Sequence, residues 1–166
     1  MRILGIDPGT ATTGYGVLNW DGSEIYSLHK FGWIETDKML EANVRLNSIY
    51  RQLMALLAEL KPDTMVMEKI FFFSNAKTII RVSQAQGVIL LAAEHSNIPV
   101  CELSPSEVKK IVTGNGRAKK PEMQTIIKKI FKLKTPDKKK THFDDAADAL
   151  AIALCYIKKN NKEPIS

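Results

Sequence analysis

Apolar positions near the start of the chain follow the spacing of β-strands. Three segments alternate or run apolar over a strand's length, residues 2–7, 13–20 and 24–35. Asp21-Gly22, between the second and third segments, is a strong signal for a tight turn. The pattern therefore predicts an antiparallel meander at the beginning of the fold.

Beyond residue 40 the apolar spacing changes to that of helices. Between Leu40 and Leu60 apolar residues recur every three or four positions, and Pro62 stands just past the end. Ser104-Pro105 is a good helix start, with serine as N-cap and proline in the first position. The remaining prediction is a strand over 64–68, a helix over 76–95, a strand over 99–103, a helix that stops at 114–116, a helix over 121–133, a basic loop over 134–142 and a last helix over 143–158.

This order predicts an α/β fold with a mixed five-stranded sheet. Three antiparallel strands come first, and two further strands return through helical crossovers, so helices should cover both faces. The 166 residues are expected to form a single domain over 1–158, with a frayed tail at 159–166.

Acidic side chains stand where strands end. Asp7 follows the apolar run Ile3–Ile6, and Glu68 follows Met65–Met67. Asp-Pro-Gly is also good turn chemistry, and Glu68 has lysines nearby for an ion pair, so each residue alone has a structural explanation. Aspartate is seldom buried unpaired, however, and two carboxylates at the ends of buried strands can converge.

A third acidic group opens the last predicted helix. Asp145 and Asp148 share one helix face, and Asp144 and Asp148 also share a face, so spacing does not choose between 144 and 145. Favourable contact with the helix dipole would explain all three without any chemistry. With Asp7 and Glu68, however, they predict a carboxylate cluster.

Such a cluster repels itself unless a divalent cation binds in it. Oxygen-only ligands favour Mg²⁺, with Mn²⁺ as a substitute, over zinc. Two ions, about 4 Å apart, would activate a water and stabilise the leaving oxygen of a phosphodiester. Cys101 and Cys155 are too few for a zinc site or a disulfide framework.

The charge distribution indicates the substrate. Residues 108–140 carry twelve basic and two acidic side chains, whereas the rest of the chain carries twelve basic and sixteen acidic ones. A concentrated basic segment is typical of a surface that binds a nucleic-acid backbone, although it can also be a solvated lysine-rich face. Together with the carboxylates it predicts a metal-dependent nuclease or strand transferase.

Two other functions fit parts of the pattern. Gly5-Ile6-Asp7-Pro8-Gly9-Thr10 is similar to the first phosphate loop of the actin, Hsp70 and sugar-kinase ATPases, but these need a second such domain. A pure DNA-binding module would not need clustered acids that repel phosphate. No apolar run approaches the roughly 18 residues of a membrane span, and the first residues do not have the layout of a signal peptide, so we expect a cytoplasmic protein without membrane contact.

The sequence resembles the RuvC-type Holliday-junction resolvases, which have a ribonuclease H-like fold. The resemblance extends from Met1 to about Lys158. Five motifs carry it: Arg2–Gly9, Glu68 with the aromatic run 71–73, Gln84–Val88, Pro105–Lys110 with 114–116, and Asp145–Ala151.

The resemblance implies a homodimer that cuts four-way DNA junctions during recombination and repair, with paired nicks in strands of like polarity. It implies Asp7, Glu68, Asp145 and Asp148 as the catalytic, metal-binding quartet, which selects Asp145 over Asp144. It also implies a branch-migration helicase complex as partner. The alternative within the same chemistry is a ribonuclease H-like nuclease that acts on RNA–DNA hybrids or flaps.

The resemblance also implies DNA contacts. Phe71 stands where the family has an aromatic side chain that stacks on a base near the crossover, and Phe72 or Phe73 could share this role. Lys109 and Lys120 match basic residues that the family uses near the scissile phosphate.

Arg117 and Lys119 extend that basic patch toward the DNA backbone. His142 and Asp144 are additions to the family pattern beside the quartet. They are accessory candidates, His142 as a proton shuttle.

Overall fold

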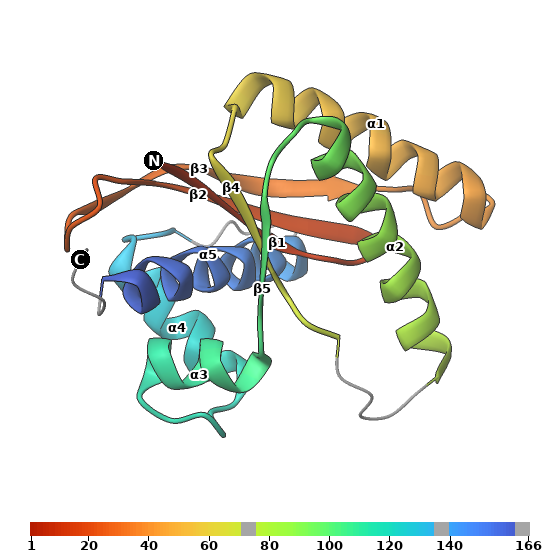
Figure 1. The fold of residues 1–166 in the computed structure, drawn as a ribbon. Helices are drawn as coiled ribbons and strands as arrows, with labels where there is room; N and C mark the ends of the chain where they lie inside the picture. The colour runs from red at the N-terminus through yellow and green to blue at the C-terminus, as the bar shows by residue number, and fades with distance from the viewer. Residues whose placement is uncertain (71–75, 135–139, 162–166) are drawn as a thin grey trace.

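The structure, a computed structural model, describes residues 1–70, 76–134 and 140–161 (Figure 1). Its centre is a sheet in the order β3-β2-β1-β4-β5. β1 pairs antiparallel with β2 and parallel with β4, β2 pairs antiparallel with β3, and β4 pairs parallel with β5. The predicted mixed sheet is confirmed. The strands are β1 (Arg2–Asp7), β2 (Thr12–Trp20), β3 (Tyr26–Glu35), β4 (Thr64–Glu68) and β5 (Val100–Leu103).

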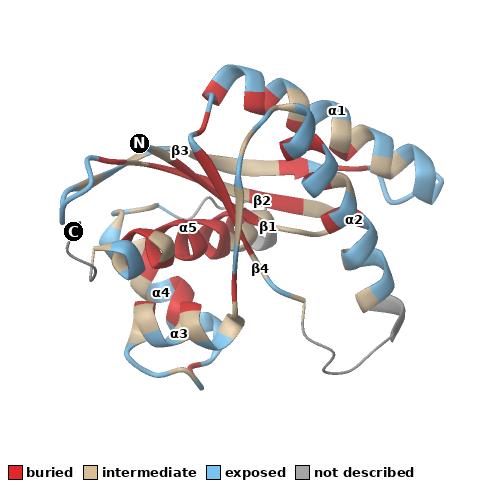
Figure 2. Ribbon diagram, viewed as in Figure 1, coloured by how far each residue is buried: buried red, intermediate tan, exposed pale blue. Residues whose placement is uncertain are grey.

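Helices cover both faces of this sheet, as the sequence predicts. The described helices are α1 (Ala42–Leu60), α2 (Ala76–His95), α3 (Pro105–Thr113), α4 (Lys120–Ile130) and α5 (Lys140–Asn160). α1 and α2 pack on one face, and α3, α4 and α5 lie on the other (Figure 1). The central strands and α5 are the most buried elements (Figure 2). Among the described helices, none has the length and apolar character that a membrane crossing requires.

The boundaries of α4 and α5 differ from the prediction. α4 ends at Ile130 instead of 133, because Phe131 is the C-cap and Lys132 takes a left-handed conformation with φ of 51°. α5 begins at Lys140, inside the predicted loop, since residues 140–142 contain no helix breaker. At its other end α5 continues to Asn160, and residues 162–166 of the expected tail lie outside the described residues.

α3 begins and ends as its sequence predicts. Ser104 and Glu107 form a capping box, in which the Glu107 amide donates to Ser104 Oγ and the Ser104 amide donates to the Glu107 carboxylate. The Ser104 hydroxyl also donates to this carboxylate, and the hydrogen bonds from the Ser104 hydroxyl and amide, with that from Lys159, lower the pKa of Glu107 to about 2. Gly114 ends the helix with φ of 81°, a conformation that favours glycine. The cap fixes the orientation of α3, which carries Lys109.

The two cysteines are free thiols. Cys155, on α5, is buried in the core, and this burial raises the pKa of its thiol to about 12. The thiol therefore stays protonated and packs as a small apolar group.

The alternation of side chains along a strand determines which face of the sheet each acidic residue points to. In β1, Ile3 packs in the core under α5, whereas Leu4 and Ile6 pack against α1 and α2. Successive side chains of a strand point to opposite faces, so Asp7 faces the α5 side together with Ile3. In β4, Val66 lies in the α5 core, so Glu68 also faces that side.

Glycines let α5 lie unusually close to the sheet. A Cβ atom on Gly5 would stand 2.0 Å from the backbone oxygen of Ala149, and one on Gly14 would stand 2.1 Å from that of Asp145. Both distances are far below van der Waals contact with atoms that cannot rotate away. α5 meets these glycines with alanine-rich turns. The close approach brings the acidic part of α5 to the end of β1.

Candidate active site

Asp7 and Glu68 come together because their strands are parallel neighbours. The register pairs Ile6 with Met67, so the residues that follow lie side by side at the same edge of the sheet. Both side chains are half-buried. The charge of Glu68 contributes to raising the pKa of Asp7, which places the two carboxylates in the same electrostatic environment.

α5 supplies the other two carboxylates. Each of Asp7, Asp145 and Asp148 offers one carboxylate oxygen, and these three oxygens lie within 4.8 Å of one another. Because α5 begins at Lys140, neither Asp145 nor Asp148 is in its first turn, so the helix dipole does not explain them. The structure thus brings three of the four predicted ligands into one cluster, with Glu68 beside it.

Asp144 points elsewhere. Its Oδ1 lies 2.7 Å from Lys128 Nζ, in a half-buried ion pair between α5 and α4. The pair gives Asp144 a structural role that joins the two helices. The geometry therefore agrees with Asp145 as the cluster member, the alternative that spacing alone left open.

The cluster is electrostatically strained without a cation. Burial, followed by the charge of Asp148, raises the pKa of Asp7 to about 8, and Lys120 partly opposes this rise. Burial is also the largest cause of the raised pKa values of Glu68, Asp145 and Asp148. Closely spaced carboxylates whose ionised forms are disfavoured are a suitable site for a hard divalent ion.

α4 places two side chains against Asp148. Lys120 Nζ lies 2.5 Å from Asp148 Oδ2. The amide of Gln124 donates to Asp148 Oδ1 and Oδ2, at 3.1 and 3.2 Å. The sequence analysis did not single out Gln124. The feature of the sequence that could have identified it is a polar residue between Met123 and Ile127 on the apolar face of α4. A buried amide at such a position needs a hydrogen-bond partner.

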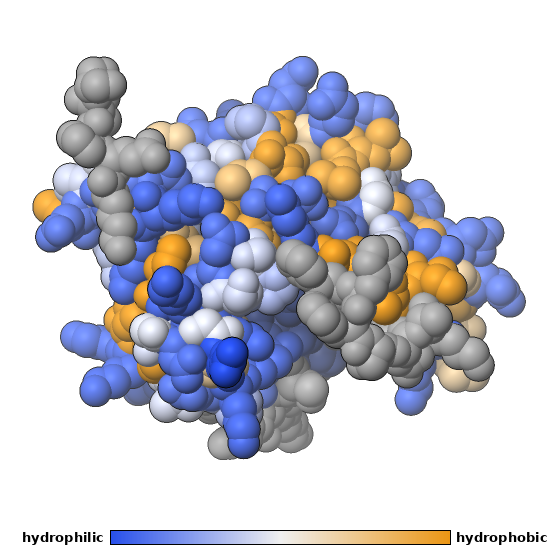
Figure 3. Space-filling model, turned by 60° about the horizontal axis from the view of Figure 1, so that its bottom comes forward, coloured by the Kyte–Doolittle hydropathy of each residue, from blue (hydrophilic) through white to orange (hydrophobic). Residues whose placement is uncertain are grey.

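The predicted DNA-binding lysines lie around the cluster. Burial raises the pKa of Glu68, and the charge of Lys109, on α3, partly opposes this rise, so its ammonium is near that carboxylate. Arg117 and Lys119 are exposed in the connection between α3 and α4, next to Lys120. Hydrophilic side chains gather over α3 and α4 on this side of the molecule (Figure 3). Phe71, Phe72 and Phe73 lie outside the described residues.

His142 lies near Asp145 and packs against β3. Its ring packs against Trp33, with 5.7 Å between ring centroids, and its Nδ1 is 3.9 Å from Glu35. Burial raises the pKa of Asp145, and the charge of His142, when present, partly opposes this rise. His142 is thus near the cluster but outside the ligand set, and its part in catalysis stays a prediction.

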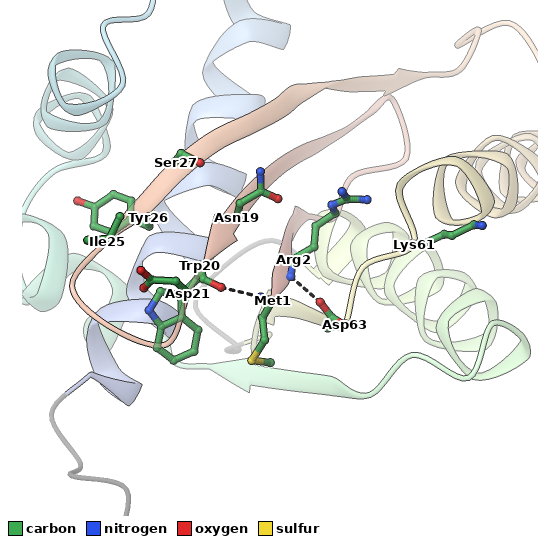
Figure 4. Close-up of a pocket in the computed structure, with 10 residues that line it drawn as sticks. All are labelled: Met1, Arg2, Asn19, Trp20, Asp21, Ile25, Tyr26, Ser27, Lys61 and Asp63. Atoms are coloured by element: carbon green, nitrogen blue, oxygen red, sulfur yellow. Dashed lines mark hydrogen bonds between the residues drawn. The ribbon is translucent and has the colours of Figure 1, made fainter.

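A separate cavity of about 570 Å³ lies at the opposite end of β1 (Figure 4). Its two aspartates are already engaged, because Asp63 accepts a hydrogen bond from the Arg2 amide and Asp21 accepts from Ser23. The N-terminal ammonium donates to the Trp20 carbonyl. These contacts engage polar groups near the start of β1, and the carboxylate cluster lies at the other end of the strand.

Comparison with known proteins decides the family. The model of the family described as crossover junction endodeoxyribonuclease RuvC matches residues 3–156. The chain belongs to the RuvC family. Its relatives include the RuvC of Syntrophomonas wolfei, 46% identical over 95% of this chain and 88% of that protein. The RuvC of Petrotoga mobilis is 47% identical over 94% of this chain and 93% of that protein.

Solved RuvC structures share the fold. That of Thermus thermophilus RuvC is 29% identical, with a TM-score of 0.80 over 99% of this chain and all of that one. The same protein in complex with Holliday junction substrate is 30% identical, with a TM-score of 0.81 over 99% of each chain. The ribonuclease H-like fold and the enzyme class, a crossover junction endodeoxyribonuclease, are as predicted. The family match also sets aside the phosphate-loop ATPase alternative.

Proposed function

We propose that this protein resolves four-way DNA junctions with two symmetric nicks in strands of like polarity. The observation that carries the proposal is the convergence of Asp7, Asp145 and Asp148 beside a basic surface, in a chain of the RuvC family. The T. thermophilus RuvC bound to Holliday junction substrate, which shares the fold over almost the whole chain, supports the choice of substrate.

We propose Asp7, Glu68, Asp145 and Asp148 as the catalytic residues that hold two Mg²⁺ ions, for which Mn²⁺ can substitute. The donor set fits, since the oxygens of three carboxylates lie within 4.8 Å of one another and the cation Lys120 already contacts one of them. When bound, the ions would polarise the scissile phosphate and lower the pKa of the attacking water.

The chain's own residues bind and orient the DNA. Lys109 and Lys120 flank the cluster and would hold the scissile phosphate, while Arg117 and Lys119 would contact the backbone farther along the strand. Phe71 would stack on a base at the junction centre. We place His142 as a candidate proton carrier and Asp144 as the partner of Lys128.

Cleavage of synthetic substrates tests the proposal. A four-way junction, a linear duplex, an RNA–DNA hybrid and a flap are each incubated with Mg²⁺, with every strand labelled in turn. We expect paired nicks at symmetric positions in opposed strands of the junction, and none in EDTA. Preferred cleavage of the hybrid or the flap would instead assign the chain to another ribonuclease H-like activity.

Symmetric cutting requires two active sites, and α2 is the proposed dimer surface. Ile80, Leu90 and Leu91 are exposed apolar residues along this helix. Gly87 lies between them, and a Cβ there would meet no atom of the described residues within 4 Å. A glycine inside an exposed helix costs about 1 kcal/mol relative to alanine. Its presence therefore favours the close approach of a second helix.

Leu91→Glu should convert the dimer to a monomer, because it places a charge in the apolar contact. We expect the dimer dissociation constant to rise roughly 100-fold or more, measured by light scattering after size-exclusion chromatography. The monomer should no longer give paired nicks. Ile25→Glu, at an exposed apolar position in the β2–β3 connection, is the matched control. An unchanged dimer with Leu91→Glu would remove α2 as the interface.

Other assignments follow from this function. We infer a single nuclease domain over residues 1–158 that acts in the cytoplasm. A branch-migration helicase complex would supply and move the junction. Co-purification of the protein with such a complex on junction DNA, but not on linear duplex, would support that partner.

A further inference from the structure

Asp148 is the most enclosed carboxylate of the cluster, and two side chains of one helix share it. The residue is 5% exposed. Gln124 Nε2 reaches both of its oxygens, and Lys120 Nζ reaches Oδ2. Lys120 and Gln124 are four residues apart on α4, so they project from the same face one turn apart.

Gln124 has the properties of a permanent partner. It is 8% exposed and lies between Met123 and Ile127, which are both buried. Its amide is neutral, so it orients the carboxylate without competing for the position of a cation. The amide nitrogen is also 3.5 Å from the Asp144 backbone oxygen, which anchors it to α5. Partners of this kind behind a ligating carboxylate fix its orientation.

Lys120 has the properties of a displaceable partner. Its side chain is 57% exposed and reaches the cluster from solvent. The Asp148 carboxylate that it contacts has an oxygen within 4.8 Å of oxygens of Asp7 and Asp145. Its ammonium therefore lies beside three carboxylates of the cluster at once. A divalent ion held by the same oxygens would repel it.

We propose that α4 controls Asp148 through two partners, of which Gln124 positions the carboxylate permanently and Lys120 occupies the place of a metal ion until one binds. Gln124 is then a positioning residue. Lys120 is a tethered cation that is released from Asp148 on metal binding and becomes free to meet a DNA phosphate. The inference rests on the proposed function in one respect, that the cluster is a metal site.

The test compares Mn²⁺ binding to the DNA-free protein by isothermal titration calorimetry. Gln124→Leu should weaken binding about tenfold or more, the loss typical when the hydrogen-bond partner of a metal ligand is removed. Lys120→Met should tighten binding about fivefold or more, the effect of removing a unit charge about 4 Å away even in water. The opposite signs are decisive, because general damage to the fold would weaken binding in both variants.

Two matched variants control for the loss of a buried amide and for the loss of a positive charge. Gln86→Leu removes another buried amide, whose partner is Glu102 on the other face of the sheet. Lys129→Met removes an exposed positive charge from the same helix. Both should leave Mn²⁺ affinity within about twofold, by the distance of their side chains from the cluster. Gln124→Met replaces Gln124→Leu if the leucine variant does not fold.

The outcomes separate this inference from the proposed function. Weaker Mn²⁺ binding in Lys120→Met, or unchanged binding in Gln124→Leu or Gln124→Met, overturns the inference while the metal site stands. A wild-type protein that binds no Mn²⁺ overturns both. Junction cleavage by wild-type protein, measured alongside, reports on the proposed function alone.

Discussion

Asp7→Asn should abolish junction cleavage and leave junction binding intact. The asparagine keeps the shape of the side chain but removes a charged oxygen ligand from the cluster. We expect the cleavage rate to fall roughly 1,000-fold or more. Binding should stay equal or become slightly tighter, since a negative charge that repels DNA phosphates is lost. Single-turnover cleavage and gel-shift titration in Ca²⁺ measure the two quantities.

The same variant should stabilise the metal-free fold at neutral pH. The pKa of Asp7 is about 8 in the folded protein against an ordinary value of 3.8, so the folded state holds a proton that the unfolded chain has lost. The contribution of Asp7 to the free energy of unfolding of the wild type therefore falls as the pH rises from about 4 to about 8, and is constant above that. The asparagine side chain of the variant has no such titration, so we expect a gain of roughly 1 to 3 kcal/mol at pH 7.

Urea unfolding in EDTA at pH 4.5 and pH 8 checks this expectation. The difference between Asp7→Asn and wild type should be larger at pH 8 than at pH 4.5. A variant that loses junction binding along with cleavage, or that is less stable than wild type at pH 8, would make Asp7 a structural residue of the turn.

Gly14→Ala should damage both the fold and the site through one added methyl group. The new Cβ would stand 2.1 Å from the Asp145 backbone oxygen and 2.9 Å from the Ala146 amide nitrogen. Neither atom can move without the helix. We expect a loss of about 1 to 3 kcal/mol in the free energy of unfolding, because α5 must shift away from β2.

The shift of α5 should also lower the cleavage rate. Asp145 and Asp148 would move relative to Asp7, and a displacement of about 1 Å can lower a rate roughly 100-fold. Cleavage should therefore fall far more than junction binding, under conditions where the variant is folded. Ser27→Ala, on the exposed side of β3, serves as the control. Normal cleavage by folded Gly14→Ala would show that the close approach of α5 does not set the geometry.

The sequence predicted the sheet and the cluster because both depend on local patterns. Asp7 and Glu68 each end an apolar strand, and the crossover through α1, from β3 to β4, makes β4 run parallel to β1. Parallel strands place the two carboxylates at one edge. The pair Asp145 and Asp148 was visible from helical spacing, but only the tertiary contact of Asp144 with Lys128 distinguishes the neighbouring aspartates by physical means.

What the sequence did not predict depends on packing between distant segments. Gln124 is an ordinary polar residue until α4 lies against α5 and brings it to Asp148. Gly14 is an ordinary strand residue until α5 crosses it. The start of α5 at Lys140 was missed because charged residues at a helix end resemble a basic loop. The roles of the aromatic run at 71–73 stay predictions, since these residues lie outside the described structure.

The most direct measurement is anomalous X-ray scattering from crystals of the wild-type protein grown with Mn²⁺. We expect manganese bound by carboxylate oxygens of Asp7 and Asp148, with Asp145 and Glu68 completing the site and Lys120 displaced from Asp148. Gln124 should still donate to Asp148. Manganese bound elsewhere, with Lys120 still paired to Asp148, would contradict the claim that this cluster is the metal centre.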